Sequence, residues 1–507
     1  MNRKTKQKRA LNVILNLLAW TGLATAPVVW AQGNTSLILA ANAADKSVSS
    51  REDLFADEKD EAAKESPKSQ ESPEPQAAQG KATSRADLFA DEGDSATDSP
   101  KPQKSALGSG IKGFVQLELG HTTESPTHWS KMLTRADFSG QGSLGNGIRW
   151  KLGMRVDYDA VYNLTNHYPG AVASDQRFNV YLRENYLDIG AGDWDFRLGR
   201  QHVVWGEMVG LFFADVVSAR DMREYILPEF DIMRIPQWAA RAEYFKGDFH
   251  AELLWIPVPS YDEIGKPGAE FYPYQIQPPG VNVVYRGEDI PTRSLRNTNY
   301  GLRLSMLKNG WDLTGFAYSS MDVSPTFYRD AVSVPGTFIY RAKHDRIDQY
   351  GGTLSKDFGE FVLKSEMVYT RGRHFPVLRL MDSDGLARQN TLDWALGLDF
   401  PFADTRFNVQ LFQRQYFSHD SDLIYDRQEN GYSLLLNHKF TDRLEAQALW
   451  ISSMNRTDWL FRPRVMWNFE RNWRLAVGAD VFKGPPLGLF GRYDGQDRVY
   501  SEIRYSF

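Results

Sequence analysis

The chain has no cysteine among its 507 residues, which excludes disulfide bonds and thiolate metal ligands. It also lacks long apolar runs: beyond Leu23, no stretch approaches the roughly 18 apolar residues that a membrane-spanning helix needs. A net charge of −5 leaves no basic excess of the kind that nucleic-acid binding normally requires. The composition therefore argues against a disulfide-rich domain, a helical membrane protein and a nucleic-acid-binding protein.

The first segment of the chain is typical of an export signal. Basic residues from Arg3 to Arg9 precede an apolar run from Leu11 to Leu23, which is the order found in secretory signal peptides. Small residues suited to cleavage occur at 29–31 and again at 41–43. We predict a signal peptide over residues 1–31, with cleavage as late as residue 43 as the alternative.

Residues 44–108 are rich in Ser, Glu, Asp, Lys, Ala and Pro and nearly free of aromatics, so we predict a disordered linker. The phrase SRxDLFADE occurs in it twice, at 50–58 and 84–92. One hypothesis is a duplication of filler sequence. The other is a docking peptide, in which Leu54, Phe55, Leu88 and Phe89 bind a periplasmic partner and two copies add avidity.

From residue 110 to Phe507 the apolar residues recur with a period of two, in segments of roughly ten residues, as in tilted membrane strands. In the segment 148–158 one face is wholly apolar, whereas the other carries Arg149, Lys151, Arg155 and Asp157. Aromatics make up 13% of the chain while its mean hydropathy is −0.47, as expected when strands face lipid on one side and water on the other. We predict an all-β fold, a transmembrane antiparallel β-barrel of about 18 strands (16–18) in a Gram-negative outer membrane.

The connections between these segments alternate between short and long, which is typical of outer-membrane barrels. We assign the short ones to the periplasm and the long ones to the outside. The predicted short turns are 142–147, 190–193, 246–248, 308–310, 357–360, 401–405, 439–442 and 470–472. The predicted long connections are 122–128, 160–177, 202–236, 257–298, 322–345, 371–389, 418–428, 453–457 and 483–497.

The segment 499–507 alternates and terminates in Phe507. It resembles the C-terminal strand by which the barrel-assembly machinery recognises its clients, so this machinery is an expected partner, together with outer-membrane lipid and lipopolysaccharide.

Cations gather on one side of the predicted lumen if the last strand pairs with the first. One hypothesis is a basic wall that attracts anionic groups, since the planar guanidinium group of Arg can donate two parallel hydrogen bonds to a carboxylate or phosphate. The alternative is that these cations pair with inward acids such as Glu118, Asp157, Asp480 and Glu502. The predicted wall consists of Arg149, Lys151, Arg155, Arg462, Arg464, Arg474 and Arg504.

The connection 202–236 is too apolar for a freely solvated loop, and we predict that it folds inward as a constriction. We expect a short helix from Asp215 to Leu227, capped by Asp215, that offers Asp221 and Glu224 to the basic wall. An external lid is the alternative. Trp205 and Glu207 complete the predicted constriction residues, and the apolar ones are Phe212, Phe213, Val216, Val217, Met222, Tyr225, Ile226 and Phe230.

Catalytic and metal motifs are weak. His202, His250 and His438 have no Ser or carboxylate at a recognisable catalytic spacing, so we predict that the chain is not an enzyme. The acidic segment 418–422 lacks the Gly and closing Glu of a calcium loop. We therefore expect no catalytic residue, no metal site and no cofactor.

The run 197–207, RLGRQHVVWGE, together with 213–217 and Leu227-Pro228, resembles a proteobacterial family of large outer-membrane proteins of unknown function. Members are commonly encoded beside RND-type exporters and a periplasmic lipoprotein-like partner, so the resemblance implies a coupled exporter. In outline the chain is also similar to alginate-export porins.

The leading functional hypothesis is an outer-membrane channel or export porin for small or amphipathic, including anionic, solutes, coupled to an inner-membrane exporter through the linker repeats. The alternatives are an outer-membrane enzyme of the lipase or esterase kind and a closed structural barrel.

Overall fold

The computed structural model of the protein describes residues 110–206, 208, 213–330, 336–380 and 384–507. The predicted signal peptide, the linker and its repeats with Leu54, Phe55, Leu88 and Phe89 lie outside these residues, as does Glu207. Within the described ranges, no helix is long and apolar enough to cross a membrane.

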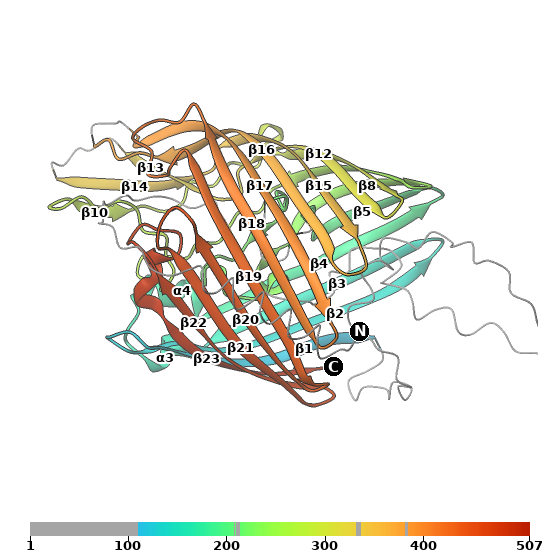
Figure 1. Cartoon of the computed structure of the whole chain (residues 1–507), viewed down its shortest axis with the longest axis horizontal. Helices are drawn as coiled ribbons and strands as arrows, with labels where there is room; N and C mark the ends of the chain where they lie inside the picture. Colours follow the sequence, from blue (N-terminus) through green and yellow to red (C-terminus); the bar gives the residue numbers. More distant parts are fainter. Residues whose placement is uncertain (1–109, 207, 209–212, 331–335, 381–383) are drawn as a thin grey trace, which may run out of the picture. The chain divides into compact units, whose positions relative to one another are not determined.

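Eighteen strands of the described part form one antiparallel sheet (Figure 1). They are β1 (Ile111–Thr122), β2 (Trp129–Gly145), β3 (Ile148–Asp159), β4 (Phe178–Ala191), β5 (Trp194–Gln201), β8 (Gln237–Lys246), β9 (Phe249–Val258), β11 (Asn299–Lys308), β12 (Trp311–Met321), β15 (Arg346–Asp357), β16 (Val362–Pro376), β17 (Leu386–Phe402), β18 (Thr405–Phe417), β19 (Gln428–Thr441), β20 (Leu444–Ser453), β21 (Trp459–Glu470), β22 (Trp473–Lys483) and β23 (Arg498–Ser506).

The sheet is closed because β23 pairs with β1, with Gln116 opposite Arg504 and Gly120 opposite Tyr500. Along the rest of the ring, each strand of the sheet pairs with the strand of the same sheet that follows it in the sequence. Closure removes both sheet edges, so every strand in the ring has partners on both sides. The prediction of an 18-stranded antiparallel barrel is confirmed.

The connections alternate as the sequence predicts. Eight short turns join β2–β3, β4–β5, β8–β9, β11–β12, β15–β16, β17–β18, β19–β20 and β21–β22. The turn between β2 and β3 contains Asn146 and Gly147, both with positive φ, a conformation that suits Gly and Asn. Strand β1 starts at the short-turn end of the barrel, opposite the longer connections.

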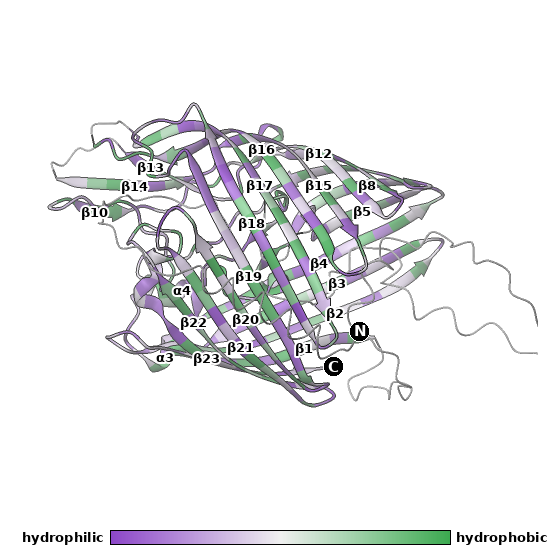
Figure 2. Cartoon of the chain, viewed as in Figure 1, coloured by the Kyte–Doolittle hydropathy of each residue, from purple (hydrophilic) through white to green (hydrophobic). Residues whose placement is uncertain are grey.

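The two faces of the strands differ as expected for a barrel in a bilayer. In β3, Leu152 and Met154 are 56% and 42% exposed on the outer face, whereas Arg155 between Met154 and Val156 is 4% exposed on the inner face. Figure 2 shows the same striping of apolar and polar residues along the strands. In β3 the outer face is therefore apolar and the inner face is polar, which is the arrangement of strands in outer-membrane barrels.

Parts of the outer connections fold into a cap. Strands β10 (Asn282–Tyr285), β13 (Thr326–Asp330) and β14 (Thr337–Lys343) form a separate small sheet beyond the barrel strands (Figure 1). Helices α3 (Val161–Leu164) and α4 (Gly170–Gln176) come from another connection. A second apolar core joins these pieces, with Val172, Tyr272, Phe327 and Tyr340 buried in it. Sequence periodicity did not reveal the cap, because its elements are too short to show a period.

Candidate functional site

The connection from 202 to 236 is here called the constriction loop, and its described residues lie within the lumen. It contains β6 (Ala219–Arg220), the single helical turn α5 (Phe230–Met233) and β7 (Arg234–Ile235). Its side chains Trp205, Val217 and Ile226 have 0% of their surface exposed. Burial of this degree requires walls around the loop, and the barrel strands supply them.

The apolar side chains of the constriction loop cross the lumen. They share one core with inward residues of β8, β9, β12 and β16 to β22. Trp205 packs near β12, with its ring centroid 5.3 Å from that of Phe316, while Tyr225 lies 6.4 Å from Phe482 of β22. A loop that leaves β5 and reaches β22 spans much of the ring, so it obstructs the lumen at this level.

Carboxylates of the wall hold the first part of the loop. The Trp205 indole N–H donates to Glu252 Oε1 of β9 at 3.0 Å. The backbone N–H groups of Met208 and Ala214 donate to the two oxygens of Glu366 of β16, at 2.7 and 3.0 Å. Glu366 is 1% exposed, and in this dry setting its bonds to the loop backbone fix both ends of the segment between Met208 and Ala214.

The second part of the loop is held by its own carboxylate, Glu229, which lies among three arginines. Arg464 and Arg474 donate to Glu229 Oε1 at 3.0 Å each, and Arg504 donates to Oε2 at 3.1 Å. Burial by itself raises the pKa of Glu229, but Arg504, Arg474 and Arg464 outweigh it, so the pKa is lowered from its ordinary value. Glu229 is therefore an anion at neutral pH, on the wall that the sequence marks as basic.

Glu224 makes a second contact of this kind. Its carboxylate lies 2.6 Å from Lys131 Nζ of β2 and 3.3 Å from an Arg498 nitrogen of β23. Burial opposes ionisation of Glu224, while Lys131 and Arg498 favour it and lower its pKa to about 2. The constriction loop thus brings two anions to one wall.

The other residues of the predicted basic wall pair mainly with acids and with loop carbonyls. Arg155 donates to Asp137 and to the carbonyl of Ile232, and Arg462 donates to Asp480 and to the carbonyl of Leu227. Lys151 lies 2.6 Å from Glu184, and Arg149 lies 3.9 Å from Asp188. All seven predicted cations lie on β3, β21, β22 and β23. The structure places them on one contiguous wall, and acids of the strands and the loop accompany them.

Three details predicted for the loop are wrong. Residues 215–227 do not form a helix: they run through β6 and a series of turns. Asp215 is not a helix cap but is buried, where it accepts from Ser218 Oγ and from Arg234 Nε. Asp221 binds Arg223 within the loop rather than a cation of the predicted wall. Packing against the lumen stabilises the irregular backbone more than local helix propensity stabilises a helix.

The histidines weighed as catalytic residues and the acidic segment weighed as a calcium site have ordinary hydrogen-bond or ion-pair partners. His250 bonds to Glu243 and His438 to Thr405, and neither is hydrogen-bonded to a serine in the part of the chain that the structure describes. In the acidic segment 418–422, Asp420 and Asp422 lie 2.7 and 2.9 Å from Arg379. An arginine therefore occupies the place that a calcium ion would take.

Sequence reasoning missed Glu229, Glu252 and Glu366. A signal for Glu229 was present: it is an isolated carboxylate between Pro228 and Phe230 in an apolar loop, and a buried carboxylate needs a cation. Nothing in the alternation of β9 or β16 separates Glu252 and Glu366 from other inward polar residues, since their role depends on what the loop brings to them.

Fold and site together define a porin-like β-barrel of the Gram-negative outer-membrane type, with a lumen obstructed by an inward loop. Residues 127–507 match the model of one protein family, described as "Protein of unknown function (DUF1302)". The chain belongs to this family, whose match includes the constriction loop and nearly the whole barrel.

Comparison with solved structures finds outer-membrane proteins at low similarity. One is OmpF of Salmonella typhi in complex with daunomycin, with a TM-score of 0.39 and 10% identity over 78% of this chain and 97% of that one. Another is a loop L8 deletion mutant of OmpT, an outer membrane protein of Vibrio cholerae, with a TM-score of 0.37 and 10% identity over 78% and 98% of the two chains. A comparison with curated proteins finds no match.

Proposed function

We propose that the protein is an outer-membrane channel, gated by the constriction loop, for small or amphipathic solutes that carry a carboxylate or phosphate. The contact of Glu229 with Arg464, Arg474 and Arg504 supports this proposal more than any other observation. Three guanidinium groups around one carboxylate make a ready site for an oxyanion.

The solute and Glu229 compete for the same cations. The Glu229 and Arg474 side chains are 20% and 22% exposed, so water and small solutes reach the pair. An anionic group that binds these arginines releases the Glu229 carboxylate, and with it the second part of the loop. Because Arg462 and Arg155 also hold loop carbonyls, release at Glu229 weakens the loop without detaching all of it.

A closed structural barrel is the second candidate, and the apolar packing of the loop favours it. Val217, Ile226 and Met233 are almost wholly buried in the core that spans the lumen, and opening exposes this surface at a cost of about 25 cal/mol per Å². The two candidates differ in whether the loop moves under working conditions.

Single-channel recording of the full-length protein in planar bilayers separates these candidates. We expect discrete steps of small conductance in neutral salt, with preference for anions in a salt gradient, and a change in step size when a dicarboxylate is added. A folded barrel that never conducts, even after the loop segment 213–233 is replaced by a Gly-Ser linker, contradicts the channel proposal.

We also propose that the linker repeats recruit a periplasmic partner of an inner-membrane exporter. Strand β1 begins on the short-turn side, which we assign to the periplasm, and this supports a periplasmic partner for the repeats. Pairwise replacement of Leu54, Phe55, Leu88 and Phe89 by Ser should abolish crosslinking of that partner in cells while the barrel still assembles. Unchanged crosslinking of the same partner by this variant would contradict the docking role of the repeats.

A further inference from the structure

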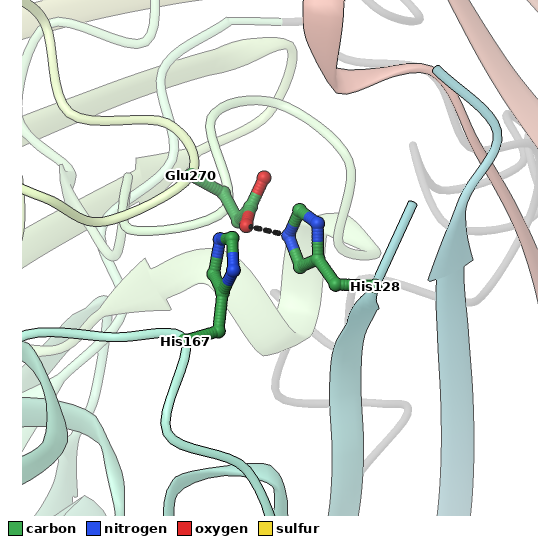
Figure 3. Close-up of side chains that lie close together, drawn as sticks. All are labelled: His128, His167 and Glu270. Carbon is green, nitrogen blue, oxygen red and sulfur yellow. Dashed lines mark hydrogen bonds and ion pairs between the residues drawn. The ribbon is translucent and has the colours of Figure 1, made fainter. Parts of the chain in front are cut away.

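Three outer connections bring two histidines and a glutamate together (Figure 3). His128 lies immediately before β2, His167 lies between α3 and α4, and Glu270 belongs to the connection between β9 and β10. These residues are far apart in the sequence, so no motif spacing reveals them. They lie on the side of the long connections, outside the barrel strands.

The cluster is compact and partly accessible. His128 Nε2 lies 2.6 Å from Glu270 Oε1, and the rings of His128 and His167 stack with their centroids 3.7 Å apart. One ligand atom from each of the three side chains lies within 4.8 Å of the other two. The His128 and Glu270 side chains are 17% and 12% exposed, and His167 is exposed, so an ion in solution can reach them.

Neighbouring groups orient two of these side chains. His128 Nδ1 lies 3.0 Å from the carbonyl oxygen of Pro126, which can only accept a hydrogen bond. The Tyr168 hydroxyl donates to Glu270 Oε1 at 2.8 Å. A backbone carbonyl on one ring nitrogen and a hydroxyl on the carboxylate are the usual outer contacts of metal ligands, since they fix the tautomer and the orientation of the ligand.

The Pro126 contact bears on which nitrogen of the neutral His128 ring carries the hydrogen. If Nδ1 carries the hydrogen that the Pro126 carbonyl accepts, the neutral ring presents a lone pair at Nε2, directly towards the Glu270 carboxylate. Two lone-pair groups 2.6 Å apart repel one another unless a proton lies between them, and a metal ion can replace that proton once the two atoms separate to roughly 3.3 Å, the spacing of two ligands on one tetrahedral zinc ion. A ring nitrogen of His167, whose ring stacks on that of His128, lies within 4.8 Å of both atoms and is the third donor.

We propose that His128, His167 and Glu270 bind one divalent transition-metal ion of the zinc class. Two imidazole nitrogens and one carboxylate oxygen form a three-ligand set that leaves a fourth position for water or an anion. Imidazole ligands favour zinc, copper or nickel, whereas calcium and magnesium prefer oxygen ligands alone. The ion fastens three outer connections to one another beside the cap.

A second group, Glu243, His250 and Glu252, has similar composition but a different environment. Glu243 lies 2.8 Å from Arg241, and Glu252 accepts from the Trp205 indole. Glu243 is therefore already neutralised by an arginine and Glu252 is engaged by the constriction loop, whereas the partner of Glu270 outside its own group is the neutral Tyr168 hydroxyl. This group serves as the internal control for the proposed site.

Zinc binding by the full-length protein in detergent micelles, after removal of metals with a chelator and without any affinity tag, tests the proposal. We expect titration calorimetry to show one tight zinc ion per chain. His167→Gln and Glu270→Gln should each weaken binding by more than about tenfold, whereas His250→Gln leaves it unchanged. His167→Gln changes an exposed side chain, and heat-modifiable gel mobility reports whether each variant is folded.

Cobalt substitution adds a readout of the ligands themselves. The wild-type protein and His250→Gln should show the visible absorption of four-coordinate cobalt, and His167→Gln should lose it. No stoichiometric binding by the folded wild-type protein overturns the proposal, and so does binding that survives both His167→Gln and Glu270→Gln.

Discussion

Glu229→Gln is expected to raise the conductance of the channel severalfold and to lower the free energy of unfolding by about 2–3 kcal/mol, because it removes one of the two carboxylates, Glu229 and Glu502, that neutralise three buried arginines. Arg464 and Arg504 are 8% and 9% exposed in their side chains, so water replaces the lost carboxylate poorly. With Glu502 as the remaining carboxylate beside the three cations, the positive charge at this wall is in excess and attracts anions from solution. Single-channel recording should therefore show larger steps and a reversal potential shifted towards anion selectivity.

Asp231→Asn is the matched control for this variant. Asp231 lies in the same loop and its removal changes the charge equally, but its side chain is 57% exposed and lies 3.8 Å from Arg234 rather than on the basic wall. It should leave conductance and selectivity close to those of the wild type. If both variants behave alike, or if Glu229→Gln changes neither quantity, the loop is not held by Glu229.

The pH dependence of the conductance is a second test of the contact between Glu229 and the arginines. The folded pKa values of Glu229 and Glu224 are lowered, and a free glutamate titrates near 4.3. A carboxyl with a lowered folded pKa stabilises the fold fully above its unfolded pKa and loses that contribution as pH falls towards the folded value. Wild-type conductance should therefore be constant near neutrality and rise below about pH 4, with a smaller rise in Glu229→Gln.

Trp205→Ala is expected to lower the free energy of unfolding by about 3–5 kcal/mol, as for other large buried aromatics. The ring is 0% exposed, lies 5.3 and 5.6 Å from Phe316 and Tyr318, and donates to Glu252. Its removal leaves a cavity and takes the indole hydrogen bond from Glu252, whose other carboxylate oxygen lies 4.0 Å from Arg303. We expect the first part of the loop to detach, which equilibrium unfolding in vesicles and channel recording can both measure.

Gly301 of β11 lies against Trp205, so a double-mutant cycle at these two positions tests the same contact. A Cβ at this position would lie 2.6 Å from Trp205 Cη2 and 2.9 Å from Tyr318 Cδ2, so Gly301→Ala should cost about 1–3 kcal/mol by overpacking. In the Trp205→Ala background the added methyl group has room on the side of the lost ring, and its cost should fall by about 1 kcal/mol. Strictly additive effects in this double-mutant cycle would show that Trp205 does not pack against the barrel wall at Gly301.

The barrel was accessible from the sequence because its determinants are local. Alternation in segments such as 148–158, and turn residues such as Asn146 and Gly147, act within a few residues and fix strand direction and hairpin register. The signal for an inward loop was also local, since residues 213–230 are too apolar to be solvated. The error over 215–227 has the same origin, because local helix propensity is weak beside packing.

The sequence by itself therefore determined an 18-stranded barrel with two unlike faces, alternating connections and one loop that cannot stay in water. Only the tertiary structure decided which charges meet: Glu229 with Arg464, Arg474 and Arg504, and His128 with Glu270. These partners come from different strands and connections, and their separation depends on ring closure and on the path of each loop. Such contacts leave no period and no spacing in the chain, since closure of the whole barrel creates them.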